Sequence, residues 1–344
     1  MVVRGKIQRP PVQKNRINNT TRHVVICVPN FYRTMTPNRW NIPDFGFGVG
    51  LRSVHYTHIL ENNPDVDWFE VISETYLESK GKVRYVLDRV AERYPIVLHG
   101  VSLSIGSSDP VNFEYLKLLK ALADRLKSPY ISDHLCWTGV NAHNVHDLLP
   151  IPYTEESLKH IVSKTKQVMD FMERPLVLEN VSTYAQFATS TMTEWEFHAR
   201  LMEESQCGML MDVNNIYVSA YNHDFDAKEF IDRIDPSLVC QYHLAGHTNK
   251  GTHILDTHND HVIDAVWELY RHAYRRTGGR NTLLEWDEDI PEFDVVHDEA
   301  LKAKRYRNEA PDTSALSVRP ATAPKIRLTP VEKNERVNSM SRSL

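Results

Sequence analysis

Cysteine is scarce in this chain. Only four occur among 344 residues, Cys27, Cys136, Cys207 and Cys240, and no two of them form a CxxC pair. This spacing excludes a disulfide framework and a cysteine-based zinc site. It also predicts a reducing, cytoplasmic location.

Long apolar runs and glycine-rich phosphate motifs are also missing. The longest early apolar run, at 24–28, is much shorter than a signal-peptide core or the ~20 residues that span a bilayer. We therefore expect no membrane partner. No GxGxxG or Walker A motif follows the first expected strand, which argues against a nucleotide-binding, doubly wound sheet.

The net charge of −5 hides an uneven distribution. Six basic side chains in residues 1–22 and a net +3 in residues 311–344 leave −14 for residues 23–310. So acidic a body repels nucleic-acid phosphates, and we expect no nucleic-acid partner. Bound cations would offset the charge, and the chain's 17 histidines make metal binding a candidate explanation.

The chain is expected to have three parts. Residues 1–43 read as an N-terminal extension, 44–303 as one catalytic domain and 304–344 as a flexible tail. The tail has four prolines, scattered serine and threonine and little apolar periodicity, a pattern typical of mobile segments. No linker rich in proline, glycine or serine interrupts the middle part, which favours a single domain.

Short apolar runs alternate with helical patterns throughout the middle part. Most runs are continuously apolar, as expected for parallel strands buried on both faces. Eight strands alternating with helices over about 250 residues predict an α/β fold, a (β/α)₈ TIM barrel. An open doubly wound sheet is the alternative. The expected strands lie at 46–52, 67–74, 95–104, 130–137, 175–181, 208–215, 241–247 and 281–288.

Nearly every expected strand ends in a residue able to bind metal. Active sites of TIM barrels lie at this end of the strands. A buried charge costs several kcal/mol unless it is paired or metal-bound, so a ring of such residues predicts a multinuclear metal site. Mixed imidazole and carboxylate donors without cysteine suit zinc, manganese or iron. The candidates are His55, Glu74, His99, Asp133, His134, Glu179, Asp212, Asn215, His243, His247, Asp256, His258 and Glu285.

Nine motifs, in order along the chain, carry a resemblance to a known family. They are GVGLR (48–52) with His55, DWFEVISETYL (67–77), HGVSLSIGS (99–107), SDHLCW (132–137), DLLPIPYT (147–154), VLEN (177–180), MDVNN (211–215), HLAGH (243–247) and LLEWDEDIP (283–291). Together they resemble the multinuclear non-heme iron-dependent oxidative enzymes (MNIO), the family of MbnB and TglH, over about residues 44–300.

The resemblance implies a xylose-isomerase-like barrel that holds two or three irons as a mixture of Fe(II) and Fe(III). It implies that Glu179 bridges the first two sites, whose ligands are also the expected catalytic residues. Matched by position, the ligands are His55, His99 and Glu179 in the first site, Asp212, His243 and Glu285 in the second, and Asn215, Asp256 and His258 in the third.

The same resemblance implies the reaction and the partners. The enzyme would use O₂ to oxidise a ribosomally synthesised precursor peptide (RiPP), at a cysteine or at a C-terminal aspartate or asparagine side chain. A small partner protein that recognises the leader peptide would form a heterodimer with it. His134, Trp137, His143 and His146 would then either line a peptide channel or only pack a loop.

Three alternative functions remain. A trinuclear zinc hydrolase, such as an abasic-site endonuclease on the same barrel, would suit the ligand set, although the acidic body disfavours a nucleic-acid substrate. A sugar isomerase is disfavoured because the motifs lack the lysine that such enzymes usually use. A binding protein with a vestigial site is disfavoured because the ligand set is complete.

Overall fold

The computed structural model describes residues 37–141 and 143–308. Parallel strands in this part form a closed barrel in the order β1-β12-β9-β8-β7-β4-β3-β2, which confirms the predicted TIM barrel and excludes the open sheet. The barrel strands are β1 (Phe47–Gly50), β2 (Trp68–Ile72), β3 (Ile96–Gly100), β4 (Ile131–His134), β7 (Leu176–Glu179), β8 (Gly208–Asp212), β9 (Val239–Leu244) and β12 (Asn281–Leu284).

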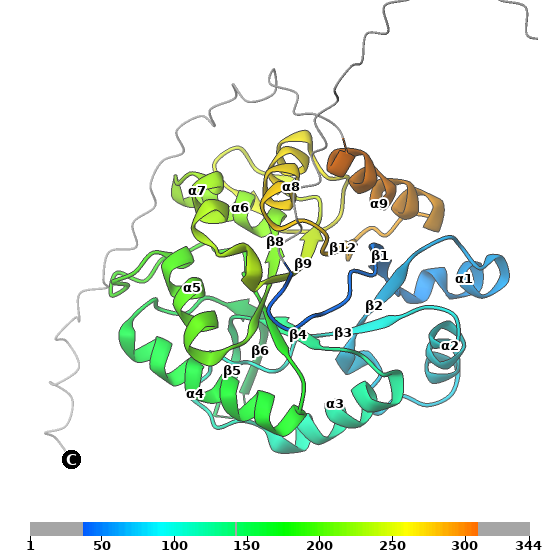
Figure 1. Ribbon diagram of the computed structural model, residues 1–344, viewed down its shortest axis with the longest axis horizontal. Helices are drawn as coiled ribbons and strands as arrows, with labels where there is room; N and C mark the ends of the chain where they lie inside the picture. Colours follow the sequence, from blue (N-terminus) through cyan, green and yellow to red (C-terminus); the bar gives the residue numbers. More distant parts are fainter. Residues whose placement is uncertain (1–36, 142, 309–344) are drawn as a thin grey trace, which may run out of the picture. The chain divides into compact units, whose positions relative to one another are not determined.

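Helices surround the barrel in a ring (Figure 1). Their apolar sides pack against the outward-facing residues of the strands and form the larger of two hydrophobic cores. The described helices are α1 (Tyr56–Asn62), α2 (Lys82–Ala91), α3 (Phe113–Leu126), α4 (Glu155–Met172), α5 (Glu194–Ser205), α6 (Val213–His223), α7 (Ala227–Arg233), α8 (Asp264–Thr277) and α9 (Phe293–Asn308), with short 3₁₀ turns η1 (Ser53–His55), η2 (Ser73–Thr75) and η3 (Pro236–Leu238).

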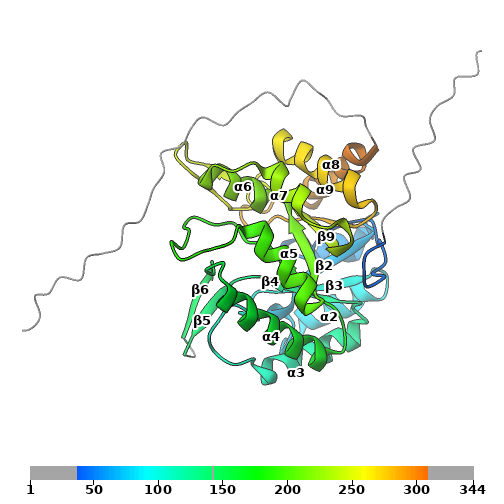
Figure 2. The same cartoon turned by 60° about the vertical axis from the view of Figure 1, so that its left-hand side comes forward.

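Two small antiparallel ribbons are inserted after barrel strands. β5 (Trp137–Val140) pairs with β6 (His143–Leu149) after β4, and β10 (Thr248–Asn249) pairs with β11 (Ile254–Leu255) after β9. The β5–β6 ribbon lies outside the barrel near α4 (Figures 1 and 2). Its residues His143 and His146 are exposed.

The inside of the barrel contains a second, smaller apolar core. Its members come from many strands yet touch one another, so they must point inward. Ile42, which precedes the first strand, is only 7% exposed and belongs to this core, with Trp40 packed against it. The inward-facing members on or beside the strands are Trp68, Val97, Tyr130, Val177, Leu210, Cys240 and Leu283.

The predicted domain boundaries fall at the ends of the described part. Of the predicted extension at 1–43, only 37–43 are described, and Ile42 packs inside the barrel. The boundary expected at 303/304 lies within α9. The rest of the predicted tail, from 309 onward, and Cys27 lie outside the described residues.

Candidate metal centre

Side-chain alternation along the strands carries polar residues into the barrel. In a strand, residues two positions apart point to the same face. A residue two positions after a member of the inner apolar core therefore also points inward, nearer the carboxyl end of its strand. This relationship holds for Glu70 after Trp68, His99 after Val97, Glu179 after Val177, Asp212 after Leu210 and Glu285 after Leu283.

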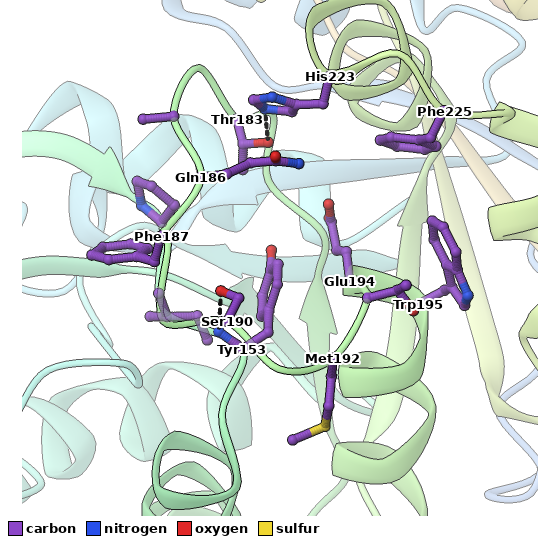
Figure 3. A pocket seen from close by; sticks show the side chains of 14 residues that line it. Tyr153, Thr183, Gln186, Phe187, Ser190, Met192, Glu194, Trp195, His223 and Phe225 are labelled. Carbon is purple, nitrogen blue, oxygen red and sulfur yellow. Dashed lines mark hydrogen bonds between the residues drawn. The ribbon is translucent and has the colours of Figure 1, made fainter. Parts of the chain in front are cut away.

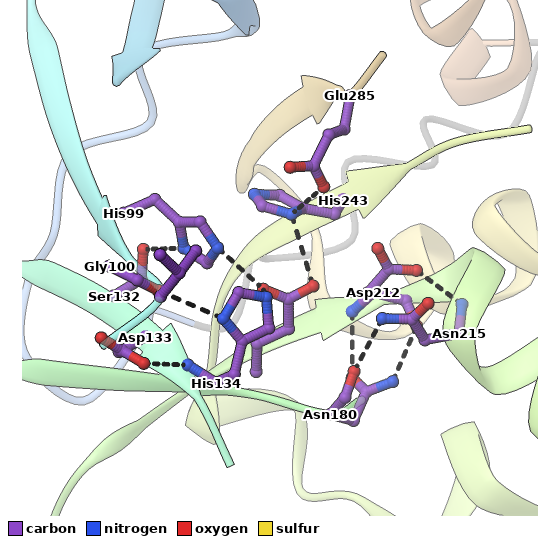
Figure 4. Close-up of polar contacts among 12 residues, drawn as sticks. His99, Gly100, Ser132, Asp133, His134, Asn180, Asp212, Asn215, His243 and Glu285 are labelled. Carbon is purple, nitrogen blue, oxygen red and sulfur yellow. Dashed lines mark hydrogen bonds and ion pairs between the residues drawn. The ribbon is translucent and has the colours of Figure 1, made fainter. Parts of the chain in front are cut away.

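Three of these inward-facing residues meet His243 at one point. Candidate ligand atoms of Glu179, Asp212, His243 and Glu285 all lie within 4.8 Å of one another. Nδ1 of His243 is 3.5 Å from Oε1 of Glu179 and 3.1 Å from Oε2 of Glu285 (Figure 4). None of the four residues is more than 5% exposed. The structure therefore brings together the predicted second site and its bridging carboxylate.

The predicted first site is only partly assembled. Nε2 of His99 lies 3.3 Å from Oε2 of Glu179, as expected for two ligands of one cation. His134 has the same relation, with Nε2 3.4 Å from the same oxygen. His55, in contrast, belongs to none of the close groups of ligand atoms among the described residues. Its Nε2 lies 2.7 Å from the carbonyl oxygen of Pro291.

The predicted third site is also partly assembled. Nε2 of His258 lies 2.8 Å from Oδ1 of Asp256, and its Nδ1 lies 3.0 Å from Oδ2 of Asp287. Asn215 is connected to the second site instead, because its backbone N–H donates a hydrogen bond to Oδ1 of Asp212 at 2.6 Å. Because Asp212 is the N-cap of α6, the start of that helix fixes both residues at the end of β8.

The histidines share one hydrogen-bonding arrangement. In each ring, one nitrogen faces an acceptor outside the predicted ligand set. The other nitrogen faces a carboxylate of the cluster at 2.8–3.5 Å in His99, His134, His243 and His258, and has no hydrogen-bond partner in His55. The acceptors are the Pro291 carbonyl for His55, Ser132 Oγ for His99, the Gly100 carbonyl for His134, Glu70 for His243 and Asp287 for His258. Metal-binding histidines are held in this way, because the acceptor fixes the tautomer and leaves the other nitrogen lone pair for the metal.

Unpartnered atoms test whether a cation fits here. A buried nitrogen or oxygen without a hydrogen-bond partner costs about 1–3 kcal/mol, so native proteins contain few of them. Seven of the nine predicted ligands have such an atom, and cations would satisfy them all. The atoms are His55 Nδ1, His99 Nε2, Glu179 Oε2, Asp212 Oδ2, Asn215 Oδ1, His243 Nδ1 and His258 Nε2.

Burial makes charge unfavourable on three of these groups, Glu179, Asp212 and His99. Burial raises the pKa of Glu179 to about 7, and burial together with the nearby Glu179 raises the pKa of Asp212 well above its usual range. Burial and the neighbouring rings of His134 and His243 lower the pKa of His99 well below its ordinary value. Deprotonated carboxylates and neutral imidazoles are the forms that bind metal, so cations would stabilise both at once.

A family model decides the identity of this barrel. The MbnB/TglH/ChrH model, which describes RiPP precursor modification enzymes, matches residues 46–308. This span contains every residue of the cluster described above. The chain belongs to this family.

Curated bacterial proteins also match this chain at high identity. A UPF0276 protein of Acaryochloris marina is 46% identical over 261 residues, which cover 76% of this chain and 94% of the relative. A UPF0276 protein of Caulobacter vibrioides is 47% identical over 253 residues, 73% of this chain and 90% of the relative. Membership indicates an enzyme that modifies a RiPP precursor.

Solved structures share the fold at low identity. D-psicose 3-epimerase from Clostridium cellulolyticum H10, determined with D-tagatose, has a TM-score of 0.52 at 11% identity, covering 76% of this chain and 98% of that one. D-allulose 3-epimerase from Methylomonas sp., in complex with D-allulose, has a TM-score of 0.50 at 12% identity, covering 77% and 97%. These likenesses concern the barrel alone. Within the described residues, no helix is both long and apolar enough to cross a membrane.

Three residues of the centre were missed by sequence reasoning or given another role. Glu70 lies in the middle of an apolar strand, and its only signal is its position two residues after Trp68. His134 is among the strand-end candidates, but the resemblance gives it no ligand role, only a peptide channel or a packed loop; it faces Glu179. Asp287 follows Glu285 by two positions and holds His258.

Proposed function

We propose that this chain is a multinuclear non-heme iron enzyme that uses O₂ to oxidise a ribosomally synthesised precursor peptide. Membership of the MbnB/TglH/ChrH family supports the substrate class. The metal part of the proposal rests on one observation: four histidine rings are each held by an acceptor at one nitrogen and turn the other nitrogen toward a carboxylate of the cluster, 2.8–3.5 Å away.

The donor atoms suit iron. All are imidazole nitrogens or carboxylate and amide oxygens, a set that binds iron, manganese or zinc and excludes metals that need sulfur. We propose that Glu179 bridges two ions because its two oxygens face different histidines. Asn215 contributes a neutral oxygen, so the third ion would be held least tightly. The proposed ligands are those predicted from the sequence, His55, His99, Glu179, Asp212, Asn215, His243, Asp256, His258 and Glu285, together with His134.

The chain's own residues would position the ligands and balance their charge. Bound iron would supply one-electron chemistry and O₂ activation. Glu70 orients the His243 ring, and the burial of the cluster keeps bulk water away from the reacting atoms. The Arg52 guanidinium lies 3.6 Å from Glu285 and pairs with Asp287, which offsets part of the negative charge at the rim.

We further propose the finer features that the family suggests. The oxidised residue would be a cysteine or a C-terminal aspartate or asparagine, and the reaction would take place in the cytoplasm. A small partner protein would bind the leader peptide and form a heterodimer with this chain. Co-purification of the chain with the products of neighbouring genes tests the partner, and recovery of the chain alone while it processes the full precursor would contradict it.

Metal analysis of the purified protein tests the proposed function. We expect two or more irons per chain and a mixed-valent signal in Mössbauer or EPR spectra. The variant Asp212→Asn should lose iron. Glu74→Gln is the matched control, because Glu74 is a strand-end carboxylate that belongs to none of the close groups of ligand atoms in the described residues, and its Oε1 accepts hydrogen bonds from Tyr115 and the backbone N–H of Val101. Stoichiometric zinc without iron, even from iron-rich cultures, would contradict the proposal and favour the zinc hydrolase.

A second experiment tests the reaction. The precursor peptide encoded beside this chain is incubated with the iron-loaded enzyme, with and without O₂, and analysed by mass spectrometry. We expect a mass change that requires O₂ and is absent with Asp212→Asn. An identical product formed under strict anaerobic conditions would contradict O₂ dependence while leaving the metal assignment standing.

A further inference from the structure

A pocket separate from the metal centre opens beside α5. Its volume is about 320 Å³, at the small end for a ligand site, and none of the proposed metal ligands lines it. Its walls come from the segment before α4, from the loop between β7 and α5 and from the end of α6 (Figure 3). The lining residues used below are Tyr153, Thr183, Phe187, Glu194, Trp195, His223 and Phe225.

The pocket contains a carboxylate without a counter-charge. The Glu194 side chain is 10% exposed and points into the pocket, where no described residue forms a hydrogen bond with it (Figure 3). The side chain of opposite charge type that lies near it is His198, whose Nε2 is 3.9 Å from Oε1 of Glu194. Burial lowers the pKa of His198 to about 3, so that ring is neutral. Burial also raises the pKa of Glu194 to about 8, so a bound cation would be needed to favour its charged form at neutral pH.

Local structure holds this carboxylate in place. Thr193 and Glu196 form a capping box at the start of α5, which fixes the first turn of the helix. Glu194 is the first residue of that turn, between these two caps. An acidic residue at this position normally points to solvent and interacts with the helix dipole. Here the loop that ends at Thr193 folds over it, so the carboxylate faces the pocket.

Aromatic rings form much of the rest of the wall. Tyr153, Phe187, Trp195 and Phe225 line the same pocket as the carboxylate, and the ring centroids of Trp195 and Phe225 lie 5.6 Å apart. The faces of aromatic rings attract cations. None of the described lining residues is lysine or arginine. The pocket therefore combines two features that favour a positive charge and offers no positive charge of its own.

A metal ion fits this pocket poorly. Glu194 belongs to no group of three close ligand atoms in the described part of the chain. The histidine of the lining, His223, is engaged through Nε2 with Thr183 Oγ1 at 2.8 Å, and burial lowers its pKa. One carboxylate surrounded by aromatic rings instead suits an organic cation with an apolar stem, such as a lysine or arginine side chain.

We propose that this pocket binds a lysine or arginine side chain of the peptide substrate, with Glu194 as its counter-ion. The assignment of the occupant rests on the proposed function. The loop that lines the pocket begins at Glu179 of the metal centre, and Thr183 follows only four residues later, at most about 14 Å away along an extended chain. Ser182 also donates to Asp256 at 3.0 Å. A basic residue about four positions from the oxidised residue would therefore reach the pocket.

Binding of small probes tests the site without requiring turnover. The probes are N-acetyl-lysine methylamide and N-acetyl-arginine methylamide, each compared with its neutral counterpart, the norleucine or citrulline amide, by ligand-observed NMR. We expect at least ten-fold weaker binding of the neutral probes. Glu194→Gln should abolish this preference, whereas Glu204→Gln, an exposed carboxylate on the same helix, should keep it. Phe225→Leu should weaken binding of the charged probes about two- to five-fold.

The outcomes separate this site from the proposed function. Equal binding of charged and neutral probes, or an unchanged preference in folded Glu194→Gln, overturns the site. If the preference is present, precursor peptides with single lysine or arginine residues replaced by norleucine or citrulline test the occupant. A replacement that raises the KM of the wild type but not the KM of Glu194→Gln supports the proposed occupant. If none of the replacements has this effect, the occupant is overturned. If the wild type contains no iron or does not oxidise the precursor, but still prefers the charged probes, only the proposed function is contradicted.

Discussion

The carboxylate of Glu70 lies 3.1 Å from Nε2 of His243, on the opposite edge of the ring from Glu179 and Glu285. Burial alone would lower the pKa of His243, but these three carboxylates outweigh it and raise the pKa well above its ordinary value. Glu70 in turn accepts a hydrogen bond from Gln241 at 2.6 Å, and Gln241 accepts one from Tyr130. A chain of buried hydrogen bonds from Tyr130 through Gln241 to Glu70 therefore holds the His243 ring in place.

Glu70→Gln should weaken metal binding without removing the centre. The amide keeps the size of the side chain but loses the charge that holds the Nε2–H of His243, and losses of this kind typically cost 10–100-fold in metal affinity. Competition of the loaded protein with a chelator measures the change. Glu74→Gln should retain wild-type affinity, and an equal loss in both variants would show that the effect is not specific to His243.

Asp212 should have two separable roles. Its Oδ1 caps α6 and its buried Oδ2 faces the centre. Asparagine caps helices as well as aspartate does, so Asp212→Asn should lose metal but leave the stability of the metal-free protein equal or higher. Asp212→Ala should lose metal and also about 1 kcal/mol from the missing cap. Urea unfolding of both metal-free variants distinguishes these roles, and equal stabilities would contradict the capping role.

Glu194 should make the free energy of unfolding depend on pH. Its pKa in the folded chain is about 8, above the ordinary value of 4.5, so the folded state holds the proton more tightly. The resulting stabilisation is complete below pH 4.5 and is lost as the pH rises through 8. Between pH 6.5 and 8.5 this amounts to about 2 kcal/mol. Glu194→Gln should remove this slope in urea unfolding curves, and parallel curves for the two proteins would contradict the burial of the charge.

Ile42 should stabilise the barrel without affecting the metal. Its side chain is buried in the inner apolar core, beneath the polar residues. Ile42→Ala should cost about 2–4 kcal/mol of stability, as other buried isoleucines do, while iron content stays at the wild-type value. A wild-type melting temperature for the variant would show that the segment before β1 is dispensable for the fold.

Sequence reasoning predicted the barrel because its signals are local. Continuous apolar runs mark each strand, and ligands at the strand ends must converge once the strands are parallel and closed. Contacts that depend on loop packing could not be predicted from the sequence. The Pro291 carbonyl meets His55 only after the chain returns from β12 to α9. Glu194 looks like an ordinary acidic residue of a first helical turn, and only the folded loop before it reveals its burial.

The apolar layer beneath the ligands has a consequence for the order of events. Ile42, Trp68 and Tyr130 pack together in the apolar core on the amino-terminal side of the ligands, which leaves the carboxyl end of the strands for access to the centre. Under the proposed function, ions, O₂ and peptide would all enter from that end. Metal loading should therefore precede peptide binding, and a bound peptide should slow the exchange of metal with solution.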